Sequence, residues 1–472
     1  MPHAFEPTLF HEFQHKGWWW LPETPKEVVP GVLVYNQSRI HLDLFGNLRM
    51  EITDDLEPAP IILGQLENGK ECTLTDNRET IVRLDGRSSR WSAGAIFLGK
   101  HFAREEEIKF TAWNINFTDL EEWIAVQPFT SHTRHDGTRF IGQQSEYVQP
   151  DSLKIPIPSL NATLETAHTL TSSGSWFGTH VREHTAFLVF TPNEAKNLIW
   201  FQDVLQTCQG LLTLFVGKPV YAQRVVADGE QIEWPDGKKS TEEIHIYFNQ
   251  LNRKKRERVS PHDMLISLPQ IKDRIGTIVP IWFEKAEALK HVYDLFLGTF
   301  YGESMYLESE FLTLTQALET YCRSTWPGKY LPDDQYKPVE EALVTAIPSG
   351  IHSGLRESLK ARLRYGNEHS LRKRLAALLA TMDDETCNLF CKNESEWCGR
   401  IVDTRNYLTH YGEQSARVIG GTDLFFANRR MSVLLTIILF KELGLEESFI
   451  RQIFNGNSHL MRLIHSYLSK GE

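Results

Sequence analysis

The 472-residue sequence has few cysteines, starts without a signal peptide and contains no long apolar run. Six cysteines in a chain of this length do not make a dense disulfide framework, which is typical of a reducing compartment. The first residues lack the basic start and the apolar stretch of a signal peptide. The longest apolar run, Val433–Phe440, is far shorter than the roughly 20 residues that span a bilayer, so it predicts a buried helix. We therefore expect a cytoplasmic protein that binds no membrane.

The sequence also lacks an excess of positive charge. Its formal net charge of −11 argues against a general nucleic-acid coat protein, but not against an enzyme that meets RNA through a local basic patch. The apolar share of 41% and the charged share of 24% are ordinary for a globular protein. At this length we expect two or three domains, each with its own core.

A convincing site for a metal or a cofactor is missing as well. The segment His11–His15 reads His-Glu-Phe-Gln-His and so spells the H-E-x-x-H signature of zinc proteases. It is followed at once by Lys16, Gly17 and a tryptophan run typical of a strand, which leaves little room for a helix, and no third ligand is evident. We interpret the motif as a coincidence and expect neither metal nor cofactor. A zinc peptidase is the least favoured alternative.

Two further patterns resemble ligand sites only in part. Gly64–Lys70 fits G-x-x-x-x-G-K, but Glu71 stands where a phosphate-binding loop has Ser or Thr. The pattern lies between two predicted strands, so we interpret it as a hairpin turn. Cys387, Cys391 and Cys398 are spaced four and seven residues apart, which predicts one helical face and buried thiols. A metal site built from these thiols is the alternative.

The first 280 residues are predicted to form two parts, a β-rich domain at 1–160 and an α+β part with a linker at 161–280. An apolar stripe predicts a helix at 195–216, and the mixture favours antiparallel sheets over a doubly wound sheet. Short alternating runs, punctuated by Gly, Asn and Asp, predict strands at 31–35, 40–45, 61–66, 72–75, 90–98, 108–117, 163–171, 185–190, 220–226 and 244–248.

Residues 281–472 are predicted to form an all-α bundle. Before it, the charge run 253–258 is interpreted as a solvated connector, the alternative being a basic patch that guides RNA. Gly399 is expected to divide the sixth helix of the bundle. The fold class is therefore α+β and multidomain, with a β-rich N-terminal region before the bundle. Helices are predicted at 281–297, 304–324, 336–347, 353–364, 370–381, 385–411, 423–443 and 449–469.

The sixth helix presents polar side chains on the face that its core does not use. Asn406 and His410 are four residues apart and project from one side, with Arg405 on the flank. Imidazole exchanges protons near neutral pH, and guanidinium holds phosphate oxygens in a fork. These three side chains are the candidate catalytic residues for chemistry on a phosphodiester. The apolar face repeats at spacings of four, three, four and three: Trp397, Ile401, Thr404, Leu408 and Tyr411.

The segment Arg405-Asn406-x-x-x-His410 resembles the R-x(4–6)-H signature of HEPN ribonucleases, in which the residue after Arg is commonly Asn, Asp or His. A second likeness, Phe311–Arg323, lies about ninety residues upstream, and others lie at 17–22 and 30–33. Over most of its length the chain is similar to ApeA-type anti-phage HEPN proteins. Glu319 and Tyr411 are expected as supporting residues, with Glu319 orienting Arg405 or His410. A plain ion pair is the alternative for Glu319.

The resemblance implies a metal-independent endoribonuclease in prokaryotic anti-phage defence of the abortive-infection type. The RNA 2′-hydroxyl would attack its own phosphate, leaving a 2′,3′-cyclic phosphate and a 5′-hydroxyl. His410 would act as general base or acid, Arg405 would stabilise the developing charge, and Asn406 would position the phosphate or His410. HEPN proteins typically dimerise with these helices facing each other, so a homodimer or larger homo-oligomer with a composite site is implied.

The implied partners are single-stranded or looped RNA, such as tRNA or mRNA, because unstacked nucleotides can reach in-line geometry. A phage-derived trigger, sensed by the N-terminal region, is implied by family analogy. The alternative function is a catalytically silent HEPN assembly module with a ligand- or protein-sensing N-terminal region. A silent module has no need to keep Arg405, Asn406 and His410 away from the core, so their placement distinguishes the two.

Overall fold

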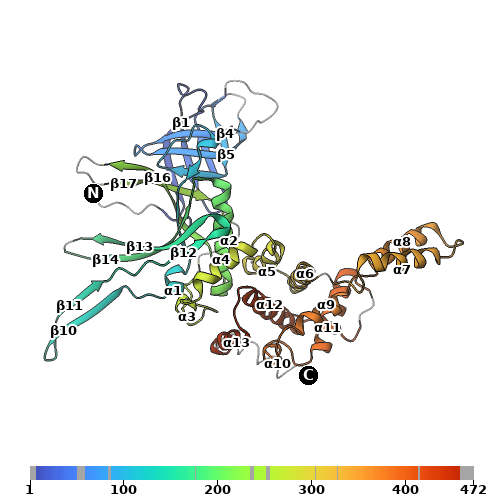
Figure 1. Ribbon diagram of the computed structural model, residues 1–472. Helices are drawn as coiled ribbons and strands as arrows, with labels where there is room; N and C mark the ends of the chain where they lie inside the picture. Colours follow the sequence, from blue (N-terminus) through green and yellow to red (C-terminus); the bar gives the residue numbers. More distant parts are fainter. Residues whose placement is uncertain are drawn as a thin grey trace. The chain divides into compact units, whose positions relative to one another are not determined.

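The computed structural model describes residues 7–49, 59–82, 87–175, 177–233, 239–250, 256–302, 305–326, 328–412 and 415–457 (Figure 1). The chain divides into two compact units, Met1–Glu284 and Lys285–Glu472. The first is β-rich and the second all-α, which confirms the predicted fold class. In the described ranges no helix is long and apolar enough to cross a membrane.

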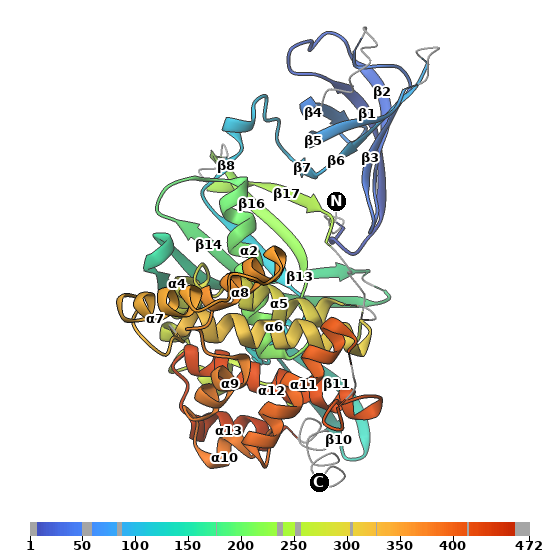
Figure 2. The same ribbon diagram turned by 90° about the vertical axis from the view of Figure 1, so that its right-hand side faces the viewer.

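Within the described residues of the first unit, six antiparallel strands close into a barrel (Figure 2). The ring order is β1-β2-β3-β6-β5-β4, and β4 pairs back onto β1. Side chains alternate across β1, so Trp19 is fully buried while Trp18 is half exposed. The strands are β1 (Phe13–Trp20), β2 (Val29–Tyr35), β3 (Ile40–Leu44), β4 (Ala59–Leu66), β5 (Glu71–Val82) and β6 (Ser89–Ala93).

Gly64 is a glycine because the barrel closes around the Trp19 ring. A Cβ at Gly64 would lie 2.3 Å from two carbons of that ring, which leaves no room for a side chain. The rest of the Gly64–Lys70 pattern forms the turn between β4 and β5, where the Gln65 side chain donates to the Gly69 carbonyl at 2.6 Å. The hairpin interpretation is confirmed.

An open antiparallel sheet continues from the barrel through β7, which pairs with β5 and β17. The order onward is β17-β16-β9-β14-β13-β12. Helix α2 lies against it, with Phe201 stacked on Trp113 at a centroid distance of 4.9 Å. The elements are β7 (Ala95–Leu98), β9 (Trp113–Phe117), β12 (Lys154–Ile157), β13 (Ala162–Gly174), β14 (His180–Pro192), α2 (Leu198–Val216), β16 (Ala222–Glu233) and β17 (Lys239–Phe248).

The boundary expected at residue 160 does not divide the structure. Strand β9, which precedes it, pairs with β14 and β16, which follow it, so one sheet spans the position. The sequence also missed β12 and a separate hairpin of two exposed strands, β10 (Phe129–Asp136) and β11 (Arg139–Tyr147). Other elements in the described part of the unit are β8 (Lys109–Phe110), α1 (Leu120–Ile124), β15 (Lys196–Asn197), α3 (Leu268–Ile271) and α4 (Ile275–Lys285), whose last residue begins the second unit.

The charge run 253–258 is partly structural rather than only solvated. Residues 251–255 lie outside the described ranges. Arg256 forms a close ion pair with the buried carboxylate of Asp119, and Arg258 lies 2.8 Å from Glu122. Both cations thus have carboxylate partners at the start of α1: the Arg256 pair is largely buried, and the Arg258 pair lies at the surface.

In the second unit, α6 packs against α5, α9, α11 and α12, and the apolar core lies among these helices. Helices α7 and α8 form a hairpin, here called the arm, that extends beyond the other helices of the unit (Figure 1). The helices are α5 (Lys290–Tyr301), α6 (Leu307–Thr325), α7 (Asp333–Thr345), α8 (Ser353–Arg364), α9 (Leu371–Leu379), α10 (Asp384–Cys387), α11 (Glu394–His410), α12 (Thr422–Glu442) and α13 (Glu447–Gly456).

Three predicted helices of the bundle differ in extent. The helix expected at 281–297 is interrupted between α4 and α5. The helix expected at 385–411 breaks after α10, and α11 restarts where the Asn393 side chain accepts from the Glu396 N–H. Gly399 lies inside α11 and does not divide it. For the helix expected at 449–469, the structure shows α13, while residues 458–469 lie outside the described ranges.

Candidate active site

Helix α11 has one buried face and one polar face, as its periodicity predicts. Ile401, Thr404 and Leu408 are buried. Thr404 donates to the Arg400 carbonyl at 2.7 Å and accepts from the Ile419 N–H at 2.9 Å, which ties the following loop to the helix. The opposite face is therefore free to present polar groups.

Tyr411 does not belong to the buried face, contrary to the sequence prediction. Helix α11 ends at His410, and Tyr411 adopts a left-handed conformation with φ of 47°. Its side chain is 72% exposed and lies edge-on to the Tyr407 ring. The helical period stops one residue before it, so the 3.6-residue rule no longer sets its direction.

The Arg405 guanidinium is directed toward α6 rather than toward His410. It lies 3.7 Å from the Glu319 carboxylate and donates to the Asn406 side-chain oxygen at 3.3 Å. The Arg405 side chain is 35% exposed and that of Glu319 is 18% exposed. The expected contact between Glu319 and Arg405 is thus present, as a loose ion pair that solvent reaches.

Glu319 belongs to a network of alternating charges that was not predicted from the sequence. Arg323, one turn later on α6, donates to Glu319 at 3.1 Å and to Glu368 at 2.6 Å. The Arg323 hydrogen bond lowers the pKa of Glu368, and the Glu368 carboxylate raises the pKa of Arg323. Arg374, buried at the start of α9, lies 3.8 Å from Glu368. Because most of these partners are far apart in sequence, only the pair Glu319 and Arg323, spaced i, i+4, could have been predicted from the sequence.

His410 is the last residue of α11 and its side chain is exposed. Its imidazole forms no hydrogen bond or ion pair with another residue of the described part of the chain. The polar face thus presents an exposed imidazole and amide beside a partly exposed guanidinium. Such groups can exchange a proton with a bound hydroxyl and hold phosphate oxygens.

The zinc-protease-like segment has the wrong local structure for its motif. His11 lies in a turn, where its ring accepts from Thr8, and β1 begins two residues later. His11 and His15 therefore do not share a helical face, which is what brings the two ligands of H-E-x-x-H together.

The three clustered cysteines are buried, which confirms their interpretation as buried thiols. They do not share a helix, because Cys387 belongs to α10, Cys391 to the following link and Cys398 to α11. Burial raises the pKa of each thiol to about 12. Across the described residues, no group of three or more His, Cys, Asp or Glu side chains could hold a metal ion.

Comparison with known proteins gives two family matches along the chain. A family model described as ApeA N-terminal domain 1 matches residues 14–282. A second, described as Apea-like HEPN, matches residues 312–449 and so includes Glu319, Arg405, Asn406 and His410. No curated protein and no solved structure matches the chain.

Proposed function

The chain belongs to the ApeA-like proteins that carry a C-terminal HEPN domain, and from this premise we propose that it is a metal-independent endoribonuclease of anti-phage defence. HEPN domains are generally associated with ribonuclease activity. The observation that carries the proposal is the polar face of α11, where Arg405, Asn406 and His410 all lie outside the core.

The proposed reaction is an internal transesterification of RNA. His410 takes the proton of a 2′-hydroxyl, and the 2′-oxygen then attacks the adjacent phosphorus. Arg405 leaves Glu319 to hold the non-bridging oxygens, whose negative charge grows in the transition state. Asn406 donates to the phosphate or holds His410. The bond from phosphorus to the 5′-oxygen breaks, and that oxygen takes up a proton, so the products are a 2′,3′-cyclic phosphate and a 5′-hydroxyl.

A single chain supplies one candidate catalytic histidine, His410, whereas the reaction needs two proton transfers. We propose that two copies of the chain place their α11 polar faces around one cleft, so that one His410 acts as base and the other as acid. Two-fold symmetry makes such a composite site natural. Light scattering of the active protein should give at least a dimer, and a fully active monomer would contradict the composite site.

The substrate is proposed to be single-stranded or looped RNA, such as tRNA or mRNA, because its nucleotides can turn into in-line geometry. Abortive-infection defence with a phage-derived trigger sensed by the N-terminal unit completes the proposal. The direct test is an RNA oligonucleotide with one 2′-deoxy nucleotide at the mapped cleavage position. Cleavage there should stop, and cutting of the 2′-deoxy linkage would rule out the mechanism.

A catalytically silent assembly module is the second candidate, and the ion pair between Arg405 and Glu319 favours it. In that case the pair would only join α11 to α6. We prefer the nuclease because a separation of 3.7 Å at a solvent-reached site leaves the guanidinium available to phosphate. Loss of RNA cleavage on His410→Ala, with folding and oligomeric state unchanged, separates the two candidates, because a silent module has no cleavage to lose.

A further inference from the structure

The arm is an unusual part of the helical unit because it has almost no core. Helices α7 and α8 are described in full, and neither contains a buried residue. Isolated helices of 12 or 13 residues are marginal in water. A structure that projects without a core of its own is well suited to reach a ligand rather than to stabilise the fold.

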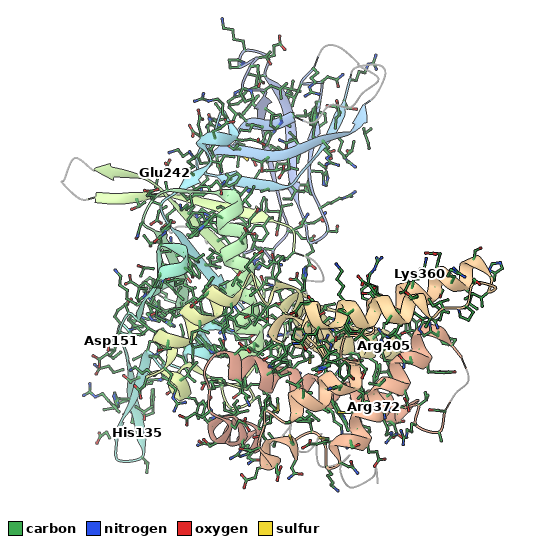
Figure 3. All side chains as sticks on the ribbon, turned by 45° about the vertical axis from the view of Figure 1, so that its right-hand side comes forward. His135, Asp151, Glu242, Lys360, Arg372 and Arg405 are labelled. Carbon is green, nitrogen blue, oxygen red and sulfur yellow. The ribbon has the colours of Figure 1, made fainter. Side chains whose placement is uncertain are left out.

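Positive charge gathers where the arm returns to the bundle. Residues 360–374 contain six Lys or Arg and one Glu, in a chain whose net charge is −11. Arg362 and Arg364, in the last turn of α8, are exposed and form no ion pair with another described residue. Lys373 is exposed as well, whereas Arg374 is buried and used structurally. Figure 3 shows Lys360 on the arm, Arg372 on α9 and Arg405 on α11.

Exposed aromatic rings lie among these cations. Tyr365 follows Arg364 directly and is 64% exposed, and Tyr330 is 56% exposed. The Lys373 ammonium lies 3.8 Å from the centre of the Tyr330 ring, and His369 meets the same ring edge-on at 4.6 Å. Cations beside exposed aromatic rings are the combination that binds single-stranded nucleic acid, through phosphates and stacked bases.

The base of the arm is held firmly and is joined to the candidate active site. Asn367 is buried, and its side chain accepts from the Leu331 N–H at 2.9 Å and donates to the Leu331 carbonyl at 2.7 Å. The adjacent Glu368 pairs with Arg323, which pairs with Glu319, the partner of Arg405. A ligand at the arm base would therefore bind to a surface joined to α6 by ion pairs, and α9, which follows the arm, packs against both α6 and α11.

We propose that Tyr330, Arg362, Arg364, Tyr365 and Lys373, here called the arm-base patch, bind single-stranded RNA and hold it for the α11 polar face. This inference rests on the proposed function and names the surface that selects the substrate. The cations bind phosphates without regard to sequence, and the two tyrosines stack on unpaired bases, so double-stranded RNA is disfavoured.

The test uses the full chain with His410→Ala, so that RNA is not cleaved during the measurement. Its affinity for an unstructured, fluorescently labelled RNA of about 20 nucleotides is measured by fluorescence anisotropy at a series of salt concentrations. Arg362→Gln with Arg364→Gln removes two cations and keeps helix-forming side chains. The slope of log affinity against log salt should fall by about 1.4, since each phosphate contact on a single strand contributes about 0.7. The matched control is Arg134→Gln with Arg139→Gln, two exposed arginines of β10 and β11, and its slope should not change.

Tyr365→Ala tests the stacking part separately. Loss of one stacked base should weaken binding by about fivefold or more, while the salt slope stays that of the parent. Circular dichroism that matches the parent shows that each variant is folded.

The inference is overturned if the arm variants bind RNA like the control, or if the parent chain does not bind the RNA. It is also overturned if the arginine variants keep their RNA binding and differ from the parent only in oligomeric state, measured by light scattering. The last result would make the arm an interface between copies. If the wild type cuts RNA but the arm variants bind RNA as tightly as the parent, the proposed nuclease activity stands and only this RNA-binding surface is rejected. If RNA binds through the arm-base patch but the wild type never cuts RNA, the surface stands and the proposed nuclease activity is rejected.

Discussion

Helix α6 pairs a glutamate with an arginine of another helix twice, and the two pairs differ in the distance between the charges and in whether a buried asparagine joins them. At its N-terminal end, the buried Glu310 accepts from Asn428 at 3.1 Å and forms a close ion pair with Arg429 of α12. Asn428 is fully buried and also donates to a backbone carbonyl at 2.9 Å. Nine residues along α6, Glu319 lies 3.7 Å from Arg405 of α11; the Arg405 side chain is 35% exposed, and that of Arg429 is 42% exposed.

The comparison shows that residue types do not decide whether a polar cluster is structural. Around Glu310 the contacts are short, and Glu310 and Asn428 are buried although the Arg429 side chain is 42% exposed, so removing Glu310 leaves the buried Asn428 amide without compensation. The ion pair between Glu319 and Arg405 has a longer separation and is reached by solvent, and such a pair contributes only about 0–1 kcal/mol to stability. The Arg405 guanidinium can therefore change partners at little cost, which is what binding a phosphate requires.

The largest expected effect is that of Arg405→Ala on catalysis. RNA cleavage should fall by about 100-fold or more, because the developing charge on the phosphate loses its main counter-charge. The free energy of unfolding should change by less than about 1 kcal/mol. Initial cleavage rates and urea denaturation measure the two effects. In the matched variant Arg429→Ala, stability should fall and the rate per folded molecule should remain; equal losses of rate in both variants would remove the distinction.

Glu310→Ala should lower the free energy of unfolding of the helical unit by about 2–3 kcal/mol, because the buried Asn428 loses an acceptor and Arg429 loses its close ion pair. The exposed part of Arg429 keeps the effect below that of a fully buried pair. Glu319→Ala is the matched change and should cost less than about 1 kcal/mol. Urea denaturation followed by helical circular dichroism compares them, and a reversed order would show that burial has been misjudged.

Thr404→Val tests whether the buried face of α11 serves stability and not catalysis. The valine keeps the shape but leaves the Ile419 N–H without its acceptor, so stability should fall by about 1–2 kcal/mol. The rate per folded molecule should change little. A loss of cleavage as large as that of Arg405→Ala would mean that the loop held by Thr404 takes part in the reaction.

The smallest effect is expected for Glu319→Gln. Its amide can still accept from Arg323, so stability should change by less than about 0.5 kcal/mol. The cleavage rate should fall by less than in Arg405→Ala, because the guanidinium remains and only its orientation is loosened. A cleavage rate as low as that of Arg405→Ala would instead make Glu319 indispensable to the reaction.

The sequence could predict the polar face of α11 because the buried positions Ile401, Thr404 and Leu408 repeat with the helical period. The helical period alone could not predict the direction of Arg405, since that depends on Glu319, more than eighty residues away, and the resemblance to HEPN proteins left open whether Glu319 orients Arg405 or His410. Tyr411 was placed wrongly because periodicity does not report a left-handed turn. The charge network through Arg323 and Glu368 is likewise a product of tertiary packing.

The fold shows the same limit. Strands with a buried side, such as those of the barrel, follow the alternation of apolar residues, whereas β10 and β11 are exposed on both sides and carry no such alternation. The most visible basic run, 253–258, is partly neutralised by Asp119 and Glu122. The cations of residues 360–374 are spread between other residue types, and only the structure shows that they gather at the base of the arm.

The measurement that tests the central claim most directly is expression of wild type, Arg405→Ala and His410→Ala in a bacterial host under phage challenge, with total RNA read for cleavage. The polar face of α11 predicts that wild type protects the host and cuts RNA, while both variants accumulate as folded protein and do neither. If the folded variants protect and cut as well as wild type, α11 is structural and the proposed active site is wrong.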